Sequence, residues 1–308
     1  MTEASLRDAF GEILLEYGKT NERIVVLDAD LSSSTRTYKF ARKFPERFFN
    51  MGISEQNMAG VAMGFAISGK IPIMSGFSIF TTGRAWEFIR MIAHDNLNVK
   101  IITTHGGFVG EDGSTHNALE DLSLMSVLPN MRVLVPSDII ELKKMVSFAI
   151  ENNGPFYLRL PRGAFPILHG ESYEFNIGSP DVIKDGNDLC LIGTGYGCSL
   201  AIKAAELIEK ELKCSVKVIN QSTIKPINET NLRNEITSVK GIIIIEEHQD
   251  YCGVGSIIAK IIVENILKPI KFVGVKNSFG QSGTRKENLN AHGLTVEGIV
   301  KLAKQLLS

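Results

Sequence analysis

Apolar residues recur along this chain at two different spacings, and stretches of the two kinds follow one another. Near the start they return every three or four positions, as on one face of an α-helix; they are Leu6, Phe10, Ile13, Leu14 and Tyr17. Gly18 is well placed to end that helix. Residues 24–27 form a short apolar run rich in β-branched side chains, which predicts a strand.

The same alternation continues through the first half of the chain. Strands are predicted at residues 48–51, 71–74, 99–104, 132–135 and 156–160. Helices are predicted at residues 54–68, 83–93, 119–128 and 139–151. Residues 106–117 are predicted to form a loop, because the segment contains four glycines.

In the second half the predicted strands are 189–192, 216–220, 242–245 and 270–275, and the predicted helices are 199–212, 229–237, 255–267 and 296–307. The periodicity lapses between Arg162 and Asp188, where prolines and glycines accumulate. We therefore expect a first domain at residues 1–165, a linker at 166–187 and a second domain at 188–308. Alternating strands and helices predict an α/β fold in which each domain is a mostly parallel sheet flanked by helices.

Composition narrows the class of protein. The chain has 308 residues, which agrees with two domains, and it is 44% hydrophobic and 22% charged, as soluble globular proteins are. A formal net charge of −1 leaves no basic footprint for nucleic acid or a membrane surface. No apolar run is long enough to span a bilayer, and the first residues lack the order of a signal peptide. The four cysteines fit neither a Cys-x-x-Cys site nor a disulfide scaffold, so we expect a soluble cytoplasmic protein.

Glycines cluster at 193, 195 and 197, between a predicted strand and a predicted helix. This favours a dinucleotide-binding interpretation, and a nicotinamide-dependent oxidoreductase is one hypothesis. The fingerprint needs its third glycine where the chain has Cys198, and an acidic residue where the next strand ends in Asn220. A tight strand-to-helix turn is the other interpretation.

The loop at residues 110–116 carries two acids and His116, and it follows a strand that ends at His105. Ligand pockets of open α/β sheets lie beyond the carboxyl ends of the strands, so both histidines could face one cleft as acids, bases or hydrogen-bond donors. Capping of local turns is the alternative. The ligand types also allow a metal site of His105, Asp112 and His116, although their spacing matches no standard zinc signature.

Three other residues have ordinary interpretations when they are taken singly. Glu55 could be a first-turn glutamate favoured by the helix dipole. Phe77 and Phe80, three positions apart, could be core residues. Their order along the chain, together with the loop at 110–116, is more informative.

The combined motifs resemble those of the thiamine-diphosphate-dependent transketolases. The matching segments are residues 52–56, 77–80, 104–105, 110–116 and 160–163. The resemblance covers essentially the whole chain, but only the second half of a full-length transketolase, which comprises its pyrimidine-binding domain and its C-terminal domain.

The resemblance implies which residues contact the cofactor. Glu55 matches the glutamate that hydrogen-bonds the aminopyrimidine ring and drives formation of the nucleophilic ylid. Phe77 and Phe80 match aromatic residues that pack on this ring, whereas a third aromatic residue of the family is replaced by Gly83. The other cofactor-binding residues that the resemblance implies are Ile53 and Asp30, the latter across a subunit boundary.

The resemblance also implies a sugar site. His105 and His116 match histidines that contact the donor sugar's first carbons and the developing oxyanion, and Asp112 matches an acid that reads a sugar hydroxyl. With Glu55, the two histidines are the implied catalytic residues. The implied anchors for the phosphate of the acceptor are Arg7, Ser34 and Arg162.

One motif of the family is missing. Its members hold the diphosphate and Mg²⁺ through Gly-Asp-Gly and a later Asn, and neither residues 110–113 nor residues 184–187 fit this pattern. We therefore expect the C-terminal subunit of a split transketolase, with a separate N-terminal subunit that supplies the Mg²⁺ ligands in an α2β2 heterotetramer. A truncated gene product is the alternative, against which the predicted first helix and the intact motifs argue.

The expected reaction is transfer of a two-carbon ketol unit from a ketose phosphate to an aldose phosphate. The two histidines with Asp112 favour it over the reaction of 1-deoxy-D-xylulose-5-phosphate synthase. The β subunit of a 2-oxoacid dehydrogenase is a further alternative, and it would lack the sugar-reading loop. A non-catalytic scaffold subunit is the alternative from another class.

Overall fold

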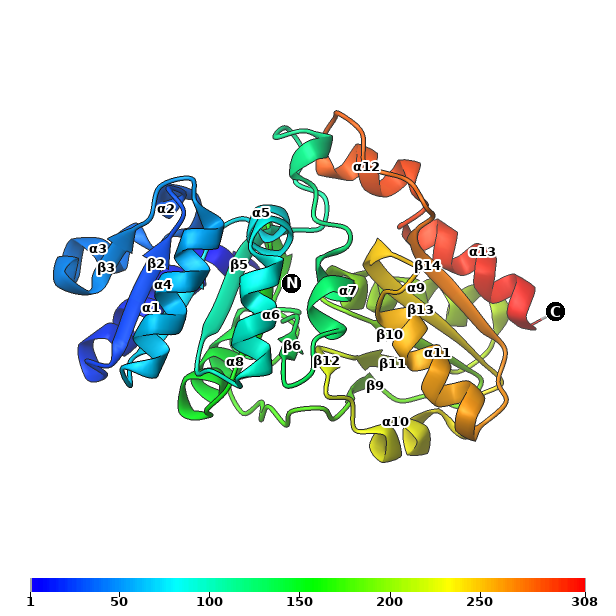
Figure 1. Cartoon of the computed structure of the whole chain (residues 1–308). Coiled ribbons are helices and arrows are strands. Elements are labelled where there is room, and N and C mark those ends of the chain that lie inside the picture. Colours follow the sequence, from blue (N-terminus) through cyan, green and yellow to red (C-terminus); the bar gives the residue numbers. More distant parts are fainter. Residues whose placement is uncertain (1, 308) are drawn as a thin grey trace. The chain divides into compact units, whose positions relative to one another are not determined.

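The computed structural model describes residues 2–307, which form two compact units (Figure 1). The first contains the chain up to Val109 and the segment His116–Phe175. The second contains Gly110–Thr115 and the chain from Asn176 onwards. No helix among the described residues is both long enough and apolar enough to cross a membrane.

The main sheet of the first unit is parallel. Its strands lie in the order β6 (Arg132–Leu134), β7 (Phe156–Pro161), β5 (Lys100–Gly106), β4 (Ile71–Ser75), β2 (Ile24–Asp28) and β3 (Phe48–Asn50). Every residue of β2, β4, β5 and β7 is buried, as expected for parallel strands with both faces covered. A separate antiparallel pair joins β1 (Glu3–Ser5) to β8 (Ala164–Pro166).

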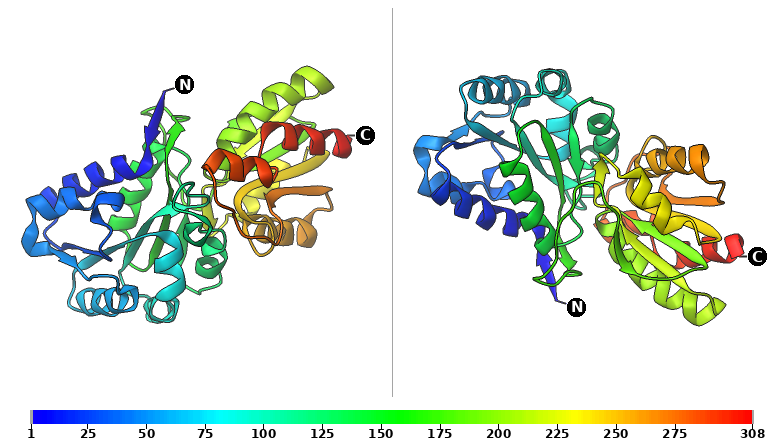
Figure 2. Two further views of the ribbon diagram at one scale, coloured as in Figure 1. Left: turned by 90° about the horizontal axis from the view of Figure 1, so that it is seen from above. Right: turned by 90° about the horizontal axis from the view of Figure 1, so that it is seen from below.

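Helices cover both faces of this sheet (Figure 2). On one face, α1 (Leu6–Thr20) packs against α3 (Tyr38–Lys43) and α8 (Ile139–Glu151). The other face carries α4 (Glu55–Ile67), α5 (Ser78–Arg84), α6 (Trp86–His94) and α7 (Asp121–Ser126). Short helices are α2 (Ser32–Thr35) and the 3₁₀ turns Pro45–Arg47 and Ser114–His116.

The second unit is built in the same way. Its sheet has the order β14 (Ile270–Val275), β13 (Gly241–Gln249), β10 (Leu189–Gly193), β11 (Val216–Asn220) and β9 (Asp181–Lys184), and only β9 runs antiparallel to its neighbour. One face carries α9 (Tyr196–Leu212) and α13 (Val296–Leu307), and the other carries α10 (Glu229–Ile236) and α11 (Val254–Asn265). Further short elements are β12 (Thr223–Lys225) and α12 (Arg285–Ala291). The predicted fold class, mostly parallel sheets flanked by helices, is confirmed.

The sequence periodicity missed several short elements, because three to seven residues are too few to establish a period. The equally short strands β3 and β6 were predicted. β8 and β9 both fall in the aperiodic segment after Arg162. The helix predicted at residues 83–93 was wrong in its start, because α5 begins at Ser78 and α6 at Trp86. The Ser78 hydroxyl donates to the carbonyl oxygen of Thr104 (3.0 Å), which ties the first turn of α5 to β5.

Candidate active site

Several of the predicted site residues lie at one edge of the first unit's sheet. β2, β4, β5 and β7 run parallel, so their carboxyl ends lie along the same edge. Asp30 follows β2, Phe77 follows β4, His105 is near the end of β5 and Arg162 follows β7. This is the edge beyond which open α/β sheets bind ligands.

Four rings meet beyond this edge. The rings of Phe77 and His105 are stacked with their centroids 3.8 Å apart, and those of Phe77 and Phe80 are 6.0 Å apart. The ring of His116 meets that of Phe80 edge-on, at 5.0 Å and 77°. The structure therefore brings together both predicted histidines and both predicted phenylalanines.

His105 has an uncommon backbone conformation, with φ of +62°. Its Nδ1 lies 2.8 Å from the hydroxyl of Thr104, and only 2% of the residue is exposed. Burial lowers the pKa of His105 to about 3, and the charges of Arg7 and Arg162 contribute in the same direction. The imidazole is therefore neutral at physiological pH, where it acts as a hydrogen-bonding group and not as a cation.

Phe77 is held in place by backbone contacts. The amide of Thr104 donates to the carbonyl oxygen of Gly76 (3.0 Å), which joins the segment before α5 to β5. A Cβ atom at Gly76 would lie 2.6 Å from the hydroxyl oxygen of Thr81, so a larger residue here would require the Thr81 side chain to shift. The hydrogen bond at Gly76 helps to hold Phe77 next to His105.

Glu55 is the first residue of α4, and its side chain is 4% exposed. Its Oε1 accepts a hydrogen bond from Nη1 of Arg84 (3.0 Å). The guanidinium carbon of Arg84 lies 4.3 Å from the centroid of the Phe80 ring. Contacts therefore run without a break from Glu55 through Arg84 and Phe80 to His116.

Glu55 and Arg84 line a pocket of about 520 Å³ together with residues 53, 54 and 56. Sequence reasoning missed Arg84, because no motif links two residues that are 29 positions apart. Gly83, where the resemblance implies an aromatic residue, is exposed, and an added Cβ atom would meet nothing within 4 Å.

Ser34, a predicted phosphate anchor, lies half-buried in α2. The buried carboxylate of Asp28 holds this helix, because it accepts hydrogen bonds from the amide of Leu31 (2.6 Å) and from the hydroxyls of Thr35 (2.7 Å) and Thr37 (2.8 Å). Burial raises the pKa of Asp28. The sequence analysis did not identify the role of Asp28 in holding α2, because a polar residue at the end of a strand is common and forms no motif.

Three arginines act electrostatically on His105: Arg7, Arg162 and Arg36. Arg7 lies half-buried in the first turn of α1, and Nη1 of Arg162 donates to the carbonyl oxygen of Val109 (2.7 Å). The sequence analysis did not identify Arg36. Its position two residues after Ser34, a predicted phosphate anchor, could have indicated it. The charges of the three arginines disfavour protonation of the His105 ring, in addition to the larger effect of burial.

Two further predicted cofactor contacts, Asp30 and Ile53, are exposed. Asp30 has a φ of +62°, and its carboxylate accepts a hydrogen bond from the side-chain Nδ2 of Asn50 (2.9 Å). Ile53, which precedes α4, is 77% exposed, an unusual environment for an isoleucine.

Asp112 belongs to the other unit, on the loop Gly110–Thr115, where it is exposed. Within residues 2–307, no group of three or more His, Cys, Asp or Glu side chains is arranged to hold a metal ion. The alternative metal site of His105, Asp112 and His116 is not formed in this part of the chain.

Both units correspond to known protein families. Residues 2–167 match the pyrimidine binding domain of transketolase, and residues 178–299 match the transketolase C-terminal domain. The chain belongs to the transketolase family. The resemblance found in the sequence motifs is therefore confirmed.

Individual relatives agree with this assignment. The chain is 43% identical over 301 residues to a protein of Methanocaldococcus jannaschii that is provisionally named a transketolase C-terminal section, with 96% of this chain and 94% of that protein covered. It is 32% identical over 308 residues to the 6-deoxy-6-sulfo-D-fructose transketolase subunit of a Clostridium species, with 99% and 95% covered. It is 33% identical to the 1-deoxy-D-xylulose-5-phosphate synthase of Carboxydothermus hydrogenoformans, but spans only 49% of that enzyme.

Solved structures share the fold. One, described as an inactive β4 tetramer of a split-gene transketolase, is 41% identical and has a TM-score of 0.90, with 98% of both chains covered. The transketolase of Campylobacter jejuni is 24% identical, with a TM-score of 0.84 over 99% of this chain and 47% of that one. The chain thus corresponds to the C-terminal section of a transketolase.

In this transketolase-family chain, the glycines at 193 and 197 serve packing. A Cβ atom at Gly193 would lie 2.4 Å from the Cα of Cys198, and one at Gly197 would lie 2.2 Å from the carbonyl oxygen of Ile245. Both glycines let α9 approach the sheet closely, which fits the interpretation as a tight turn. The nicotinamide hypothesis lacks the third glycine and the acidic residue of its fingerprint.

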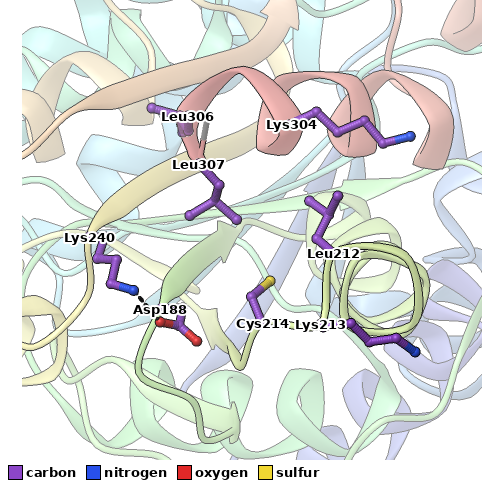
Figure 3. Close-up of a pocket in the computed structure, with 8 residues that line it drawn as sticks. All are labelled: Asp188, Leu212, Lys213, Cys214, Lys240, Lys304, Leu306 and Leu307. Atoms are coloured by element: carbon purple, nitrogen blue, oxygen red, sulfur yellow. Dashed lines mark hydrogen bonds and ion pairs between the residues drawn. The ribbon is translucent and has the colours of Figure 1, made fainter.

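A second pocket, of about 550 Å³, lies in the second unit (Figure 3). It lies where β10, β11 and β13 begin, opposite the edge that binds ligands in such sheets. Asp188 pairs with Lys240 (2.8 Å), while Lys213 follows the last turn of α9 and Lys304 lies in that of α13. Lys213 and Lys304 favourably complement the negative ends of α9 and α13.

Proposed function

We propose that this chain is the C-terminal subunit of a split transketolase, which transfers a two-carbon ketol unit from a ketose phosphate to an aldose phosphate. The observation that carries this proposal is the unbroken series of contacts from Glu55 through Arg84 and Phe80 to His116, with Phe77 and His105 beside it. It joins the residues implied for the cofactor to those implied for the sugar.

The pyrimidine-binding domain implies thiamine diphosphate as the cofactor. The residues present fit its aminopyrimidine ring, because the Glu55 carboxylate is buried beside a pocket and the Phe77 and Phe80 rings lie nearby. Glu55 would hydrogen-bond a ring nitrogen, and the two phenylalanines would pack on the ring. When bound, the cofactor supplies the electron sink that cleavage of the donor's carbon–carbon bond requires. Asp30 and Ile53 are proposed as its further contacts in the assembled enzyme.

His105 and His116 would orient the donor sugar. His105 is neutral and held by Thr104, so it presents one fixed hydrogen-bonding nitrogen to a carbonyl or hydroxyl oxygen. His116 is half-buried against Phe80, and can exchange protons with the sugar as an acid or base. Asp112 would bind a sugar hydroxyl.

Arg7, Ser34 and Arg162 would bind the phosphate of the acceptor, and Arg36 adds positive charge to the same region. Guanidinium groups form bidentate hydrogen bonds with phosphate, which fixes both its position and its orientation. Burial is the main cause of the low pKa of His105, and the charges of the arginines lower it further, so a bound phosphate would remove part of this lowering.

A separate N-terminal subunit would hold the diphosphate and Mg²⁺, because this chain has no Gly-Asp-Gly motif with a following Asn that fits. Two relatives that the chain matches over nearly their whole length are named as transketolase subunits. The proposed active assembly is an α2β2 heterotetramer, in which copies of this chain alone would be inactive, as the β4 tetramer of the split-gene relative is described to be.

The test is to produce this chain together with the N-terminal subunit and to measure ketol transfer from xylulose 5-phosphate to ribose 5-phosphate, with thiamine diphosphate and Mg²⁺. We expect transfer by the complex and none by either subunit alone. An assembled, cofactor-loaded complex that transfers nothing would overturn the proposal.

Two alternative functions give different results when the same complex is assayed with other substrates or with a variant. Consumption of pyruvate with glyceraldehyde 3-phosphate would identify a 1-deoxy-D-xylulose-5-phosphate synthase, a reaction favoured by the 33% identity to such an enzyme. A complex whose activity is unaffected by removal of the Glu55 carboxylate would identify this chain as a scaffold subunit.

A further inference from the structure

The loop Gly110–Thr115 folds with the second unit, although its neighbours on both sides, Val109 and His116, belong to the first. The loop carries Asp112, which is proposed to bind a sugar hydroxyl, and its last residue directly precedes His116. The second unit therefore holds a segment that the proposed reaction needs.

Gly110 is the point where this loop meets α12. Its φ of +77° favours glycine, and an added Cβ atom would lie 3.2 Å from the backbone nitrogen of Arg285 and 3.9 Å from the carbonyl oxygen of Gly283. The amide of Gly113 donates to the carbonyl oxygen of Gly110 (3.0 Å), which closes the loop into a turn. The position of α12 therefore limits where the loop can lie.

α12 itself is fixed at its first turn. The side chains and amides of Thr284 and Glu287 bond each other reciprocally, at 3.2 Å and 2.7 Å. The guanidinium of Arg285 makes two hydrogen bonds, of 3.1 Å and 2.5 Å, to the buried carboxylate of Glu247 in β13. Its carbon also lies 4.1 Å from the centroid of the Tyr196 ring.

We propose that Arg285 is a positioning residue for ketol transfer: through its bond to Glu247 it fixes α12 against Gly110, and α12 in turn fixes the loop that carries Asp112. This inference rests on the proposed function. A paired guanidinium suits this task, because two parallel hydrogen bonds set the orientation of α12 as well as its distance from β13. A lysine would set only the distance.

The kinetic test uses the assembled, cofactor-loaded complex. We expect Arg285→Ala and Gly110→Ala each to raise the KM for xylulose 5-phosphate roughly tenfold, with kcat changed much less and thiamine diphosphate affinity unchanged. Arg285→Lys should not restore the KM. The double variant should resemble the worse single variant, because both substitutions disturb one contact. A double variant in which the two effects multiply would contradict the coupling.

Hydrogen exchange of the segment 107–116 tests the same coupling without any activity. Exchange should be faster in Arg285→Ala and in Glu247→Gln than in the wild type, and unchanged in Lys286→Ala, a matched control on the exposed side of α12. Faster exchange in a complex that shows no ketol transfer would mean that only the proposed function fails. Unchanged exchange in the first two variants would overturn the role of Arg285.

Discussion

The carboxylate of Glu55 and the guanidinium of Arg84 form an ion pair of 3.0 Å in which only one partner is buried. The Glu55 side chain is 4% exposed, whereas that of Arg84 is 51% exposed and lies over the Phe80 ring. The arginine therefore reaches from the surface to a carboxylate that water hardly contacts. Removal of Arg84 would leave a buried charge without its partner, whereas removal of Glu55 would leave a guanidinium that water can still solvate.

Arg84→Met is expected to lower the free energy of unfolding by about 1–2 kcal/mol, because it leaves the buried carboxylate of Glu55 without its charged partner. In a Glu55→Gln background the same substitution should cost clearly less. Urea unfolding at pH 7 measures both. Arg90→Met, at an exposed position of α6, is the control, and an equal loss there would contradict the explanation.

Glu55→Ala is expected to leave assembly with the N-terminal subunit intact and to lower ketol transfer by orders of magnitude, because it removes the proposed proton-sharing contact to the cofactor. Size-exclusion chromatography of the complex checks assembly, and steady-state kinetics check transfer. Activity within severalfold of the wild type would favour the scaffold function.

The stability of the chain should depend on pH through His105, whose pKa is lowered to about 3 by burial and then by Arg7 and Arg162. Below pH 6.5 the unfolded chain binds a proton on this residue that the folded chain does not, so folding weakens as the pH falls. The expected loss from this one group is about 1–2 kcal/mol between pH 6.5 and pH 5.

His105→Asn removes the titrating ring and tolerates the same backbone conformation. The difference in unfolding free energy between wild type and variant should therefore shrink or reverse as the pH falls. Urea unfolding at pH 7, 6 and 5 measures it. A difference that stays constant over this range would show that His105 is not the group responsible.

Gly197→Ala is expected to destabilise the second unit by about 3 kcal/mol or more, because the added Cβ atom would lie 2.2 Å from a backbone oxygen of β13. Gly83→Ala is the matched control: it lies in α5 with open space around it, so it should be neutral or slightly stabilising. Thermal unfolding compares the two. A stable Gly197→Ala protein would remove the packing explanation for the glycine cluster.

The sequence predicted the large features because they rest on repeated spacings. The long strands of both sheets and most of the longer helices follow from runs of apolar residues, and Phe77, Phe80, His105 and His116 follow from motif order. The positions of these four side chains were predictable only because parallel strands end along one edge.

The rest depends on contacts between residues far apart in the chain. Arg84 reaches Glu55 across 29 positions, and Asp28 anchors α2 through hydroxyls that carry no pattern. The placement of Asp112 in the second unit could likewise not be predicted, because a loop of six residues has no period.

The backbone of His105 restricts how this position can evolve. A φ of +62° is readily adopted by glycine, asparagine and aspartate, but strains most other side chains, and β-branched ones most of all. A library randomised at position 105 and selected only for folding would therefore return few amino acids. The amino acids that position 105 can accept are therefore limited by the backbone conformation in β5 as well as by the chemistry of the ring.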